Sequence, residues 1–337
     1  MNQEMHIKQS SLLEAPVFSS EVLAWIAENN LWNLWVPKAY NGLELSLTEG
    51  LQKLQGLAKT DGSLGWTVTL CSGANYFIGN LQPEVCSEIF LSPNKSVCFG
   101  GSGGVSGTAE QQGDAYNISG EWHYATGAPY LTHFTLNAKI IADGDVVLND
   151  DGTPLVYSFV IPKEAVRIIE NWNAMGLKAT ATHSFQIHSA VVSSKYAFVY
   201  NTFYLPQPIF KIPFSVFSDL TLWVNYLGMA EHYLEEATTI LEQETLEPFY
   251  SVLLKTNQQL YKFAEQIELL TTTETVITEA YIETIHTTAT ASVKEISKAI
   301  LEVYPLLGVK ACSEQHTLNR IFRDYFTATQ HHNFSGR

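Results

Sequence analysis

The hydrophobic positions divide the chain into three zones with different spacing. From about Ser10 to Phe90, apolar residues recur three and four positions apart, as in the segments SSEVLAWIAENNLW and LTEGLQKLQGLAKT. This spacing predicts amphipathic helices, and Ser19 or Ser20 is placed to cap the first of them. Pro37 and the pair Asn41-Gly42 predict a break between the two segments. The first zone is therefore predicted to be helical.

The middle zone, from about Lys95 to Pro208, changes to alternating apolar and polar positions. Segments such as AYNISGEWHYATG and HFTLNAKIIADGDVVL predict strands, and the pair Asp143-Gly144 is typical of a hairpin turn. The Gly-rich run Gly100–Glu110 is predicted to be a loop, which is either flexible or holds a phosphate or a substrate through its backbone N–H groups. This zone predicts an antiparallel β unit, either a barrel or a sandwich.

Helical spacing returns from about Phe214 to the end of the chain, where the pattern predicts about four helices. The segment Thr271–Thr290 holds nine threonines, which favour strands by propensity. Its apolar residues are nevertheless spaced as in a helix, so a helix is predicted there. The order of helices, strands and helices predicts an α+β fold with three domains, which cover residues 1–93, 94–208 and 209–337.

Composition narrows the functional classes. Hydrophobic residues make up 46% of the chain and charged residues only 16%, so either much of the surface is buried between subunits or it is rich in uncharged polar residues. A formal net charge of −15 disfavours nucleic acid and anionic membranes as partners. The four cysteines have no metal-ligand spacing, so no metal site is expected. The N-terminus lacks the pattern of a signal peptide, and we expect a cytoplasmic protein without a membrane span.

Four stretches carry a resemblance to a known family. They read LWVPKAYNGLELSLTEG, AKTDGSLGWTV, GDAYNISGEWHYATGAPYLTHFTLNAKI and WNAMGLKATATHSFQI. Over nearly its whole length, the chain resembles the acyl-CoA dehydrogenase superfamily, and the final run RIFRDYFTATQHH resembles its flavin-dependent monooxygenase branch. The resemblance implies an N-terminal helical domain, a central antiparallel β-barrel or sandwich, and a C-terminal four-helix bundle.

The resemblance also implies a flavin site, centred on the strand Glu121–Thr126 and holding FAD or FMN, in some cases as the reduced flavin. A flavin needs hydrogen-bonding groups along its polar edge and apolar cover on its ring faces. Trp122 is expected to shield the ring, and Lys178 stands where the family usually has Arg. The implied cofactor-binding residues are Trp122, Tyr124, Ala125, Thr126, Gly127, Lys178 and Thr180.

The same resemblance suggests residues for the chemistry. His331, near the chain end, is expected to assist oxygen chemistry at the flavin, because histidine exchanges protons near neutral pH. The alternative for His331 is a surface histidine on a fraying terminus. The implied substrate-binding residues are Trp66, Gly101, Ser102 and His183. The implied partners are a small organic substrate and a separate flavin reductase, and the expected assembly is a homodimer or homotetramer.

Two other functions remain open. A FAD-dependent acyl-CoA dehydrogenase needs a carboxylate base, but Glu231, Glu235 and Glu236 are predicted to lie on a solvated helix face. The family's Thr-Glu-Pro-x-Ala-Gly-Ser-Asp type motif is also missing from the Gly-rich run. The second alternative is a family member that keeps the fold without catalysis.

Overall fold

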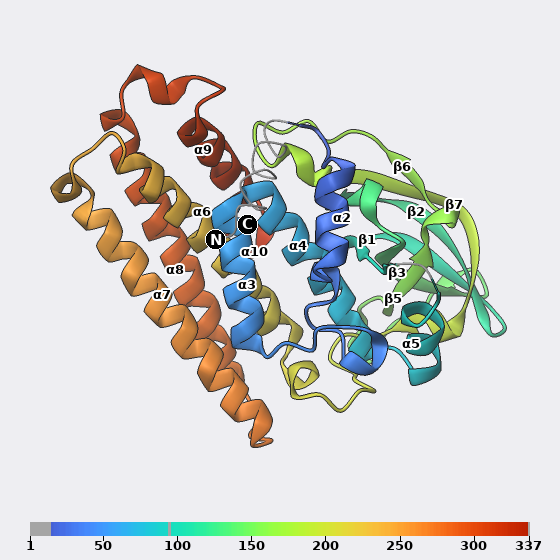
Figure 1. Cartoon of the computed structure of the whole chain (residues 1–337). Helices are drawn as coiled ribbons and strands as arrows, with labels where there is room; N and C mark the ends of the chain where they lie inside the picture. Colours follow the sequence, from blue (N-terminus) through green and yellow to red (C-terminus); the bar gives the residue numbers. More distant parts are fainter. Residues whose placement is uncertain (1–14, 94–95, 336–337) are drawn as a thin grey trace.

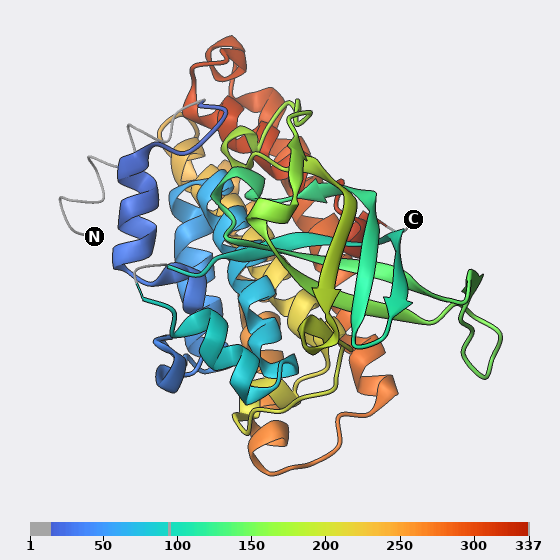
Figure 2. The same ribbon diagram turned by 90° about the vertical axis from the view of Figure 1, so that its right-hand side faces the viewer.

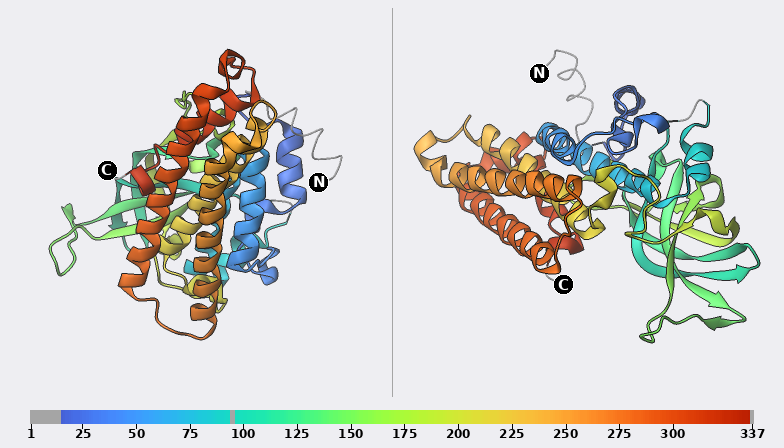
Figure 3. Two further views of the ribbon diagram at one scale, coloured as in Figure 1. Left: turned by 90° about the vertical axis from the view of Figure 1, so that its left-hand side faces the viewer. Right: turned by 90° about the horizontal axis from the view of Figure 1, so that it is seen from below.

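The computed structural model describes residues 15–93 and 96–335, and the N-terminal segment in which no signal peptide is expected lies outside them. Along the described chain, helices come first, then the strands of one sheet, and then a second set of helices (Figure 1). Figure 3 shows the second set of helices at one end of the molecule and the sheet at the other. The predicted α+β order is therefore confirmed.

The N-terminal helices begin where the sequence predicts. Ser19 caps α2 (Ser20–Glu28) by accepting a hydrogen bond from the Val22 N–H. Ser46 and Glu49 form a reciprocal capping box at the start of α3 (Leu47–Thr60). Two further helices follow, α4 (Gly62–Asn75) and α5 (Pro83–Phe90).

The sheet has eight strands and a mixed topology. Their order is β6-β7-β2-β1-β3-β5-β8, with β4 paired to β3. The strands are β1 (Phe99–Gln112), β2 (Ala115–Ala125), β3 (His133–Ala142), β4 (Asp145–Val146), β5 (Val156–Pro162), β6 (Arg167–Ile169), β7 (His183–Ser193) and β8 (Ala197–Phe198). The pairing of β1 with β3 is parallel, so the expectation of an antiparallel unit is wrong for this pair. Figure 2 shows the hairpin between β3 and β5 projecting from the molecule.

The Gly-rich run is a central strand, and the prediction of a loop at Gly100–Glu110 is wrong. Close packing explains Gly101 and Gly107, and a Cβ at Gly101 would lie 1.7 Å from the Thr135 carbonyl oxygen. A Cβ at Gly107 would lie 2.2 Å from the Trp122 ring. Glycine therefore serves the approach of neighbouring backbone and indole, rather than loop flexibility.

The C-terminal helices are α6 (Phe214–Ala237), α7 (Gln243–Thr272), α8 (Glu279–Val303), α9 (Thr317–Ala328) and the short α10 (His332–Ser335). The four long helices confirm the prediction of about four. In the threonine-rich segment, a turn separates α7 from α8, and the helix resumes at Glu279. Spacing thus decides the structure of most of this segment. Within the two described ranges, no helix is both long and apolar enough to cross a membrane.

Helix α4 connects the two halves of the molecule. It packs against α3 and α6 on one side and against β1 on the other (Figure 1). All of its residues except Leu70 and Gly73 are buried. At its end, Asn75 donates to the Val97 carbonyl at 3.0 Å and accepts from the Phe99 N–H at 2.6 Å, which attaches the helix to the start of β1.

Candidate active site

The end of β2 departs from regular strand geometry where a flavin is expected. Tyr124 has a left-handed φ of 64°, and the pairing of β2 with β7 shifts register between Trp122 and Ala125. Gly127 follows with a φ of 76°, and its N–H donates to the Thr180 carbonyl at 2.8 Å. This hydrogen bond connects the end of β2 to the turn Lys178–Thr180, which is far away in the sequence.

The break in strand geometry reverses the expected roles of two aromatic residues. Trp122 is completely buried, stacks on Phe185 at 5.3 Å and donates its indole N–H to the Asn137 carbonyl. The prediction that Trp122 shields a flavin ring is therefore wrong, because its ring is enclosed in the sheet core. Tyr124, two residues later, is 74% exposed. Strand alternation would place both rings on one face, but the register shift and the positive φ separate them.

Three buried threonine hydroxyls join the two turns. Thr180 donates to the Leu177 carbonyl at 2.7 Å, and its oxygen lies 2.7 Å from the hydroxyl of Thr182. Thr182 in turn lies 3.1 Å from the hydroxyl of Thr126. Each hydroxyl has one proton, so Thr182 donates to Thr180 and Thr126 donates to Thr182. Thr126 is left with acceptor capacity alone, and a ligand at this turn meets an acceptor there.

Helix α4 lies directly behind the β2 turn. The Cys71 thiol is 3.8 Å from the Thr126 carbonyl oxygen, and a Cβ on Gly127 would lie 2.9 Å from the same sulfur. One turn earlier on the helix, Trp66 forms an edge contact with His331, with their ring centroids 5.6 Å apart. Two residues predicted separately for this site, Trp66 and His331, are therefore neighbours.

His331 is held in a defined state. Burial, with a smaller contribution from His332, lowers the pKa of His331 from 6.5 to about 4, so its ring is neutral near pH 7. Its Nδ1 accepts the Asn333 N–H at 3.4 Å, which leaves the proton on Nε2. The alternative of a surface histidine on a fraying end does not fit this packing. His331 is instead a neutral hydrogen-bond donor.

Two buried carboxyl groups lie at the start of α4. Asp61 caps α4 by accepting the Leu64 N–H at 2.9 Å, and Asp324 on α9 accepts the Leu177 N–H at 2.5 Å. Burial and, to a smaller extent, the neighbouring Asp61 together raise the pKa of Asp324 to about 7. Burial also raises the pKa of Asp61. Helix α9 thus holds the loop that leads to Lys178 and Thr180.

Arg323 supports the same loop. Its Nη1 donates to the Met175 carbonyl at 2.8 Å, and a Cβ on Gly176 would lie 2.3 Å from the Arg323 backbone. The sequence did not indicate that α9 and this loop meet. The glycine at position 176 is the one local signal, because it permits this close approach.

The remaining predicted residues lie in varied surroundings. Lys178 is half-buried in the 3₁₀ turn Lys178–Thr180, and Ala125 is fully buried. Gly101 and Ser102 lie on β1, where Ser102 accepts the Gly104 N–H at 3.3 Å. His183 accepts the Trp172 N–H on Nδ1 at 3.0 Å, and burial lowers its pKa. The structure therefore gives His183 a role in holding its own loop.

Glu231, a carboxylate considered for a dehydrogenase, is hydrogen-bonded to Gln55. Glu231 is partly buried and accepts from the Gln55 amide at 2.8 Å, and burial raises its pKa. The prediction that Glu231 lies on a solvated face is wrong, because α6 packs this position against α3. Glu235 remains exposed and pairs with Lys59 at 2.6 Å.

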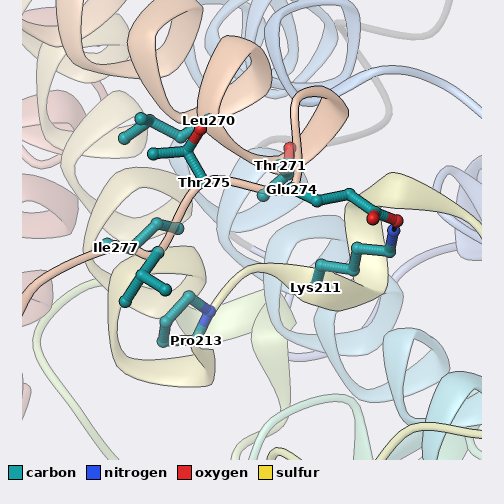
Figure 4. A pocket seen from close by; sticks show the side chains of 8 residues that line it. Lys211, Pro213, Leu270, Thr271, Glu274, Thr275 and Ile277 are labelled. Carbon is teal, nitrogen blue, oxygen red and sulfur yellow. Dashed lines mark hydrogen bonds and ion pairs between the residues drawn. The ribbon is translucent and has the colours of Figure 1, made fainter.

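A separate pocket of about 360 Å³ lies at the turn between α7 and α8 (Figure 4). Lys211 and Glu274 form an ion pair of 2.7 Å across it. The pocket is lined by Lys211, Pro213, Leu270, Thr271, Glu274, Thr275, Val276 and Ile277. No residue predicted for cofactor or substrate lines this pocket. Among the described residues, no group of His, Cys, Asp and Glu is arranged to hold a metal ion.

Comparisons with known proteins bear on the fold and on the class of protein. Residues 255–336 match the family model "Acyl-CoA dehydrogenase, C-terminal domain". The indole-3-acetate monooxygenase of Pseudomonas putida is 28% identical over 219 residues, which cover 65% of this chain and 54% of that protein. The oxygenase subunit HsaA of a flavin-dependent monooxygenase from Rhodococcus jostii is 20% identical over 219 residues, or 61% of this chain and 54% of that protein. The chain thus spans about half the length of the curated relatives it matches.

Solved structures show the same fold. XiaF from Streptomyces sp., in complex with FADH2 and glycerol, superposes with a TM-score of 0.88 at 16% identity, covering 98% of this chain and 89% of that one. The HsaA monooxygenase from M. tuberculosis gives a TM-score of 0.87 at 16% identity, with 98% and 92% covered. The fold is therefore the one that these two solved structures share. The indole-3-acetate monooxygenase and the two HsaA proteins are monooxygenases or their components, which confirms the resemblance to the flavin-dependent monooxygenase branch.

Proposed function

We propose that the chain is the oxygenase component of a flavin-dependent monooxygenase, which receives reduced FMN or FAD from a separate reductase and oxidises a small aromatic substrate. The observation that carries the proposal is that helix α4 connects four segments that are distant in the sequence. The Thr126–Gly127 turn contacts Thr182 and the Cys71 and Thr67 positions of α4, and Trp66 on the same helix contacts His331. The names of the relatives support the reaction class.

The residues at the β2 turn fit a reduced flavin. A reduced flavin carries an N–H at N5 where the oxidised ring has only a lone pair. Thr126, whose proton is directed to Thr182, can accept from that N–H and keep its bond to Thr182, whereas donating to the oxidised ring would cost it that bond. The exposed ring of Tyr124 can cover a flavin face, which is the role first expected of Trp122. A bound reduced flavin would supply the two electrons that oxygen activation requires.

The substrate side of the site is aromatic. Trp66 contacts both His331 and Tyr226, with ring centroids 5.6 Å and 6.0 Å apart. An aromatic ring packs well against such a wall, and the neutral His331 can donate from Nε2 to a polar group of the substrate. Two relatives are named for aromatic acids, indole-3-acetate and p-hydroxyphenylacetate. We infer that the substrate is a small aromatic compound with a hydrogen-bond acceptor.

The test measures binding of FMN and FAD in both redox states under anaerobic conditions. Reduced flavin should bind more tightly than oxidised flavin, and Thr182→Val should reduce that preference by up to about tenfold, the value of one hydrogen bond. Thr287→Val, at an exposed position on α8, serves as the matched control. Tight binding of oxidised FAD would support the dehydrogenase alternative, and binding of neither flavin would support a non-catalytic protein.

We also propose that the protein is a cytoplasmic homodimer or homotetramer. Several large apolar side chains on α7 and α8 are about half exposed, among them Tyr250 at 52%, Leu254 at 46% and Leu301 at 51%. Covering them against another copy of the chain would remove apolar surface from water. Light scattering after size-exclusion chromatography measures the assembly, and a monomer at micromolar concentration would contradict the proposal.

A further inference from the structure

The short helix α10 directly follows His331 and is too short to be stable alone. Two of its side chains attach it to the helical bundle. Phe334 is buried, with its ring 5.7 Å from that of Tyr226. Asn333 donates to Asp219 on α6 at 2.9 Å and to the Ser218 hydroxyl at 3.3 Å. The placement of α10 therefore depends on α6.

Asp219 is the polar half of this attachment. It is 3% exposed, and besides Asn333 its carboxylate contacts the Nδ1 of His286 on α8 at 3.1 Å. Burial raises the pKa of Asp219, His286 and Asn333 lower it, and Glu283 on α8 raises it. A buried carboxylate is costly unless it is paired, and here α8 and α10 supply its partners.

The attachment reaches the candidate active site through a backbone bond. The N–H of Asn333, the residue that Asp219 binds, donates to the Nδ1 of His331 at 3.4 Å. On its other side, the His331 ring contacts Trp66. If Asn333 moved, Nδ1 would lose its donor, and the imidazole would be free to change its tautomer and its orientation.

We propose that Asp219, supported by His286, is a positioning residue that fixes α10 and through Asn333 holds His331 as the neutral tautomer with its proton on Nε2. The contacts among Asp219, Asn333 and His331 are present whatever reaction the protein performs. The use of this His331 tautomer in catalysis rests on the proposed monooxygenase function. Asp219 itself touches neither Trp66 nor the Thr126 turn in any contact described above. It acts through Asn333, since it binds the side chain of the residue whose N–H reaches His331.

The test follows each histidine separately. Exchange of the imidazole C2 hydrogen for deuterium, read by mass spectrometry with fragmentation between His331 and His332, reports the pKa of each ring. Amide exchange over residues 328–335 reports whether α10 stays in place. In Asp219→Ala, the pKa of His331 should rise from about 4 toward its ordinary 6.5 as the ring gains solvent, and α10 should lose protection. Asp219→Asn should have a smaller effect, because its amide oxygen can still accept from Asn333.

Two further variants make the test decisive. Asn333→Ala removes the side-chain bonds that attach α10 to Asp219 and Ser218, keeps the backbone N–H that reaches His331, and leaves Asp219 and His286 in contact. It should therefore shift His331 by releasing α10, even if Asp219→Ala does not fold. Glu295→Gln breaks an exposed ion pair between α8 and α7 and should leave His331 unchanged. An unaltered His331 in folded Asp219→Ala and in Asn333→Ala would overturn the proposal. Because exchange is measured without flavin, failure of the proposed function would not affect this result, and a loss of oxygenase activity with an unshifted His331 would argue against positioning by Asp219.

Discussion

Replacing Asp324 by asparagine should change how stability depends on pH. In the folded protein the pKa of Asp324 is about 7, against 3.8 for the free side chain. Between these two values the folded state keeps the proton while the unfolded state has lost it, so stability falls as pH rises through this window. When the pH falls from about 8 to about 5, the folded carboxyl takes up its proton over about two pH units. The free energy of unfolding of the wild-type protein therefore rises by about 3 kcal/mol.

Asparagine has the shape of the protonated acid and keeps an oxygen for the Leu177 N–H, but it does not titrate. The free energy of unfolding in urea, measured at about pH 5 and about pH 8, should therefore change about 3 kcal/mol less in Asp324→Asn than in the wild type. Because Asp61 titrates together with Asp324, part of the change is shared by the pair. Glu302→Gln, an exposed change on α8, should match the wild type at both values. Equal pH dependence in Asp324→Asn and the wild type would refute the reasoning.

Three other substitutions test the architecture of the site. Gly127→Ala puts a Cβ at a φ of 76° and 2.9 Å from Cys71, so the unfolding free energy should drop by about 1–2 kcal/mol in urea titration. Asn75→Ala leaves the Phe99 N–H without its partner and should cost about 1–3 kcal/mol, seen as a lower thermal midpoint. Tyr124→Ala, at a 74% exposed position, should change stability by less than about 0.5 kcal/mol while weakening reduced-flavin binding in anaerobic titration; unchanged flavin affinity would exclude Tyr124 from the site.

The sequence predicts those parts of the fold that depend on local spacing. Helical periodicity located α2 and α3, and it correctly outweighed the strand propensity of the threonines from Glu279 onward. The Gly-rich strand was missed because Gly101 and Gly107 are required by close neighbours, Thr135 on β3 and Trp122 on β2, and not by a local turn. A single sequence does not show which neighbouring strand packs closely against a given glycine.

For the candidate site too, local motifs support some predictions, whereas contacts between distant strands decide others. Thr126, Gly127, Trp66 and His331 were predicted because motifs resemble a family. The structure joins Thr126 to Thr182 and Trp66 to His331, and their roles at a flavin stay predictions. Trp122 was misplaced because strand alternation was assumed to continue through a register shift that only the pairing with β7 reveals.

The pairs that support the site were not found from the sequence at all. Leu177 with Asp324, and Asp219 with His286, are each separated by many residues along the chain. Neither member of either pair lies in a spacing that marks it as a partner. Such pairs are set by how helices dock on one another, and this is decided by packing over the whole molecule.

The burial of α4 on nearly every side has a consequence for how the molecule opens. A helix with one solvent-facing stripe can fray or detach while the rest of the protein stays folded. Helix α4 cannot, since leaving the sheet would uncover the face held by Asn75 and leaving the bundle would uncover the face of Trp66. Its amide hydrogens should therefore exchange with solvent only when sheet and bundle come apart together, which makes both halves one cooperative unit.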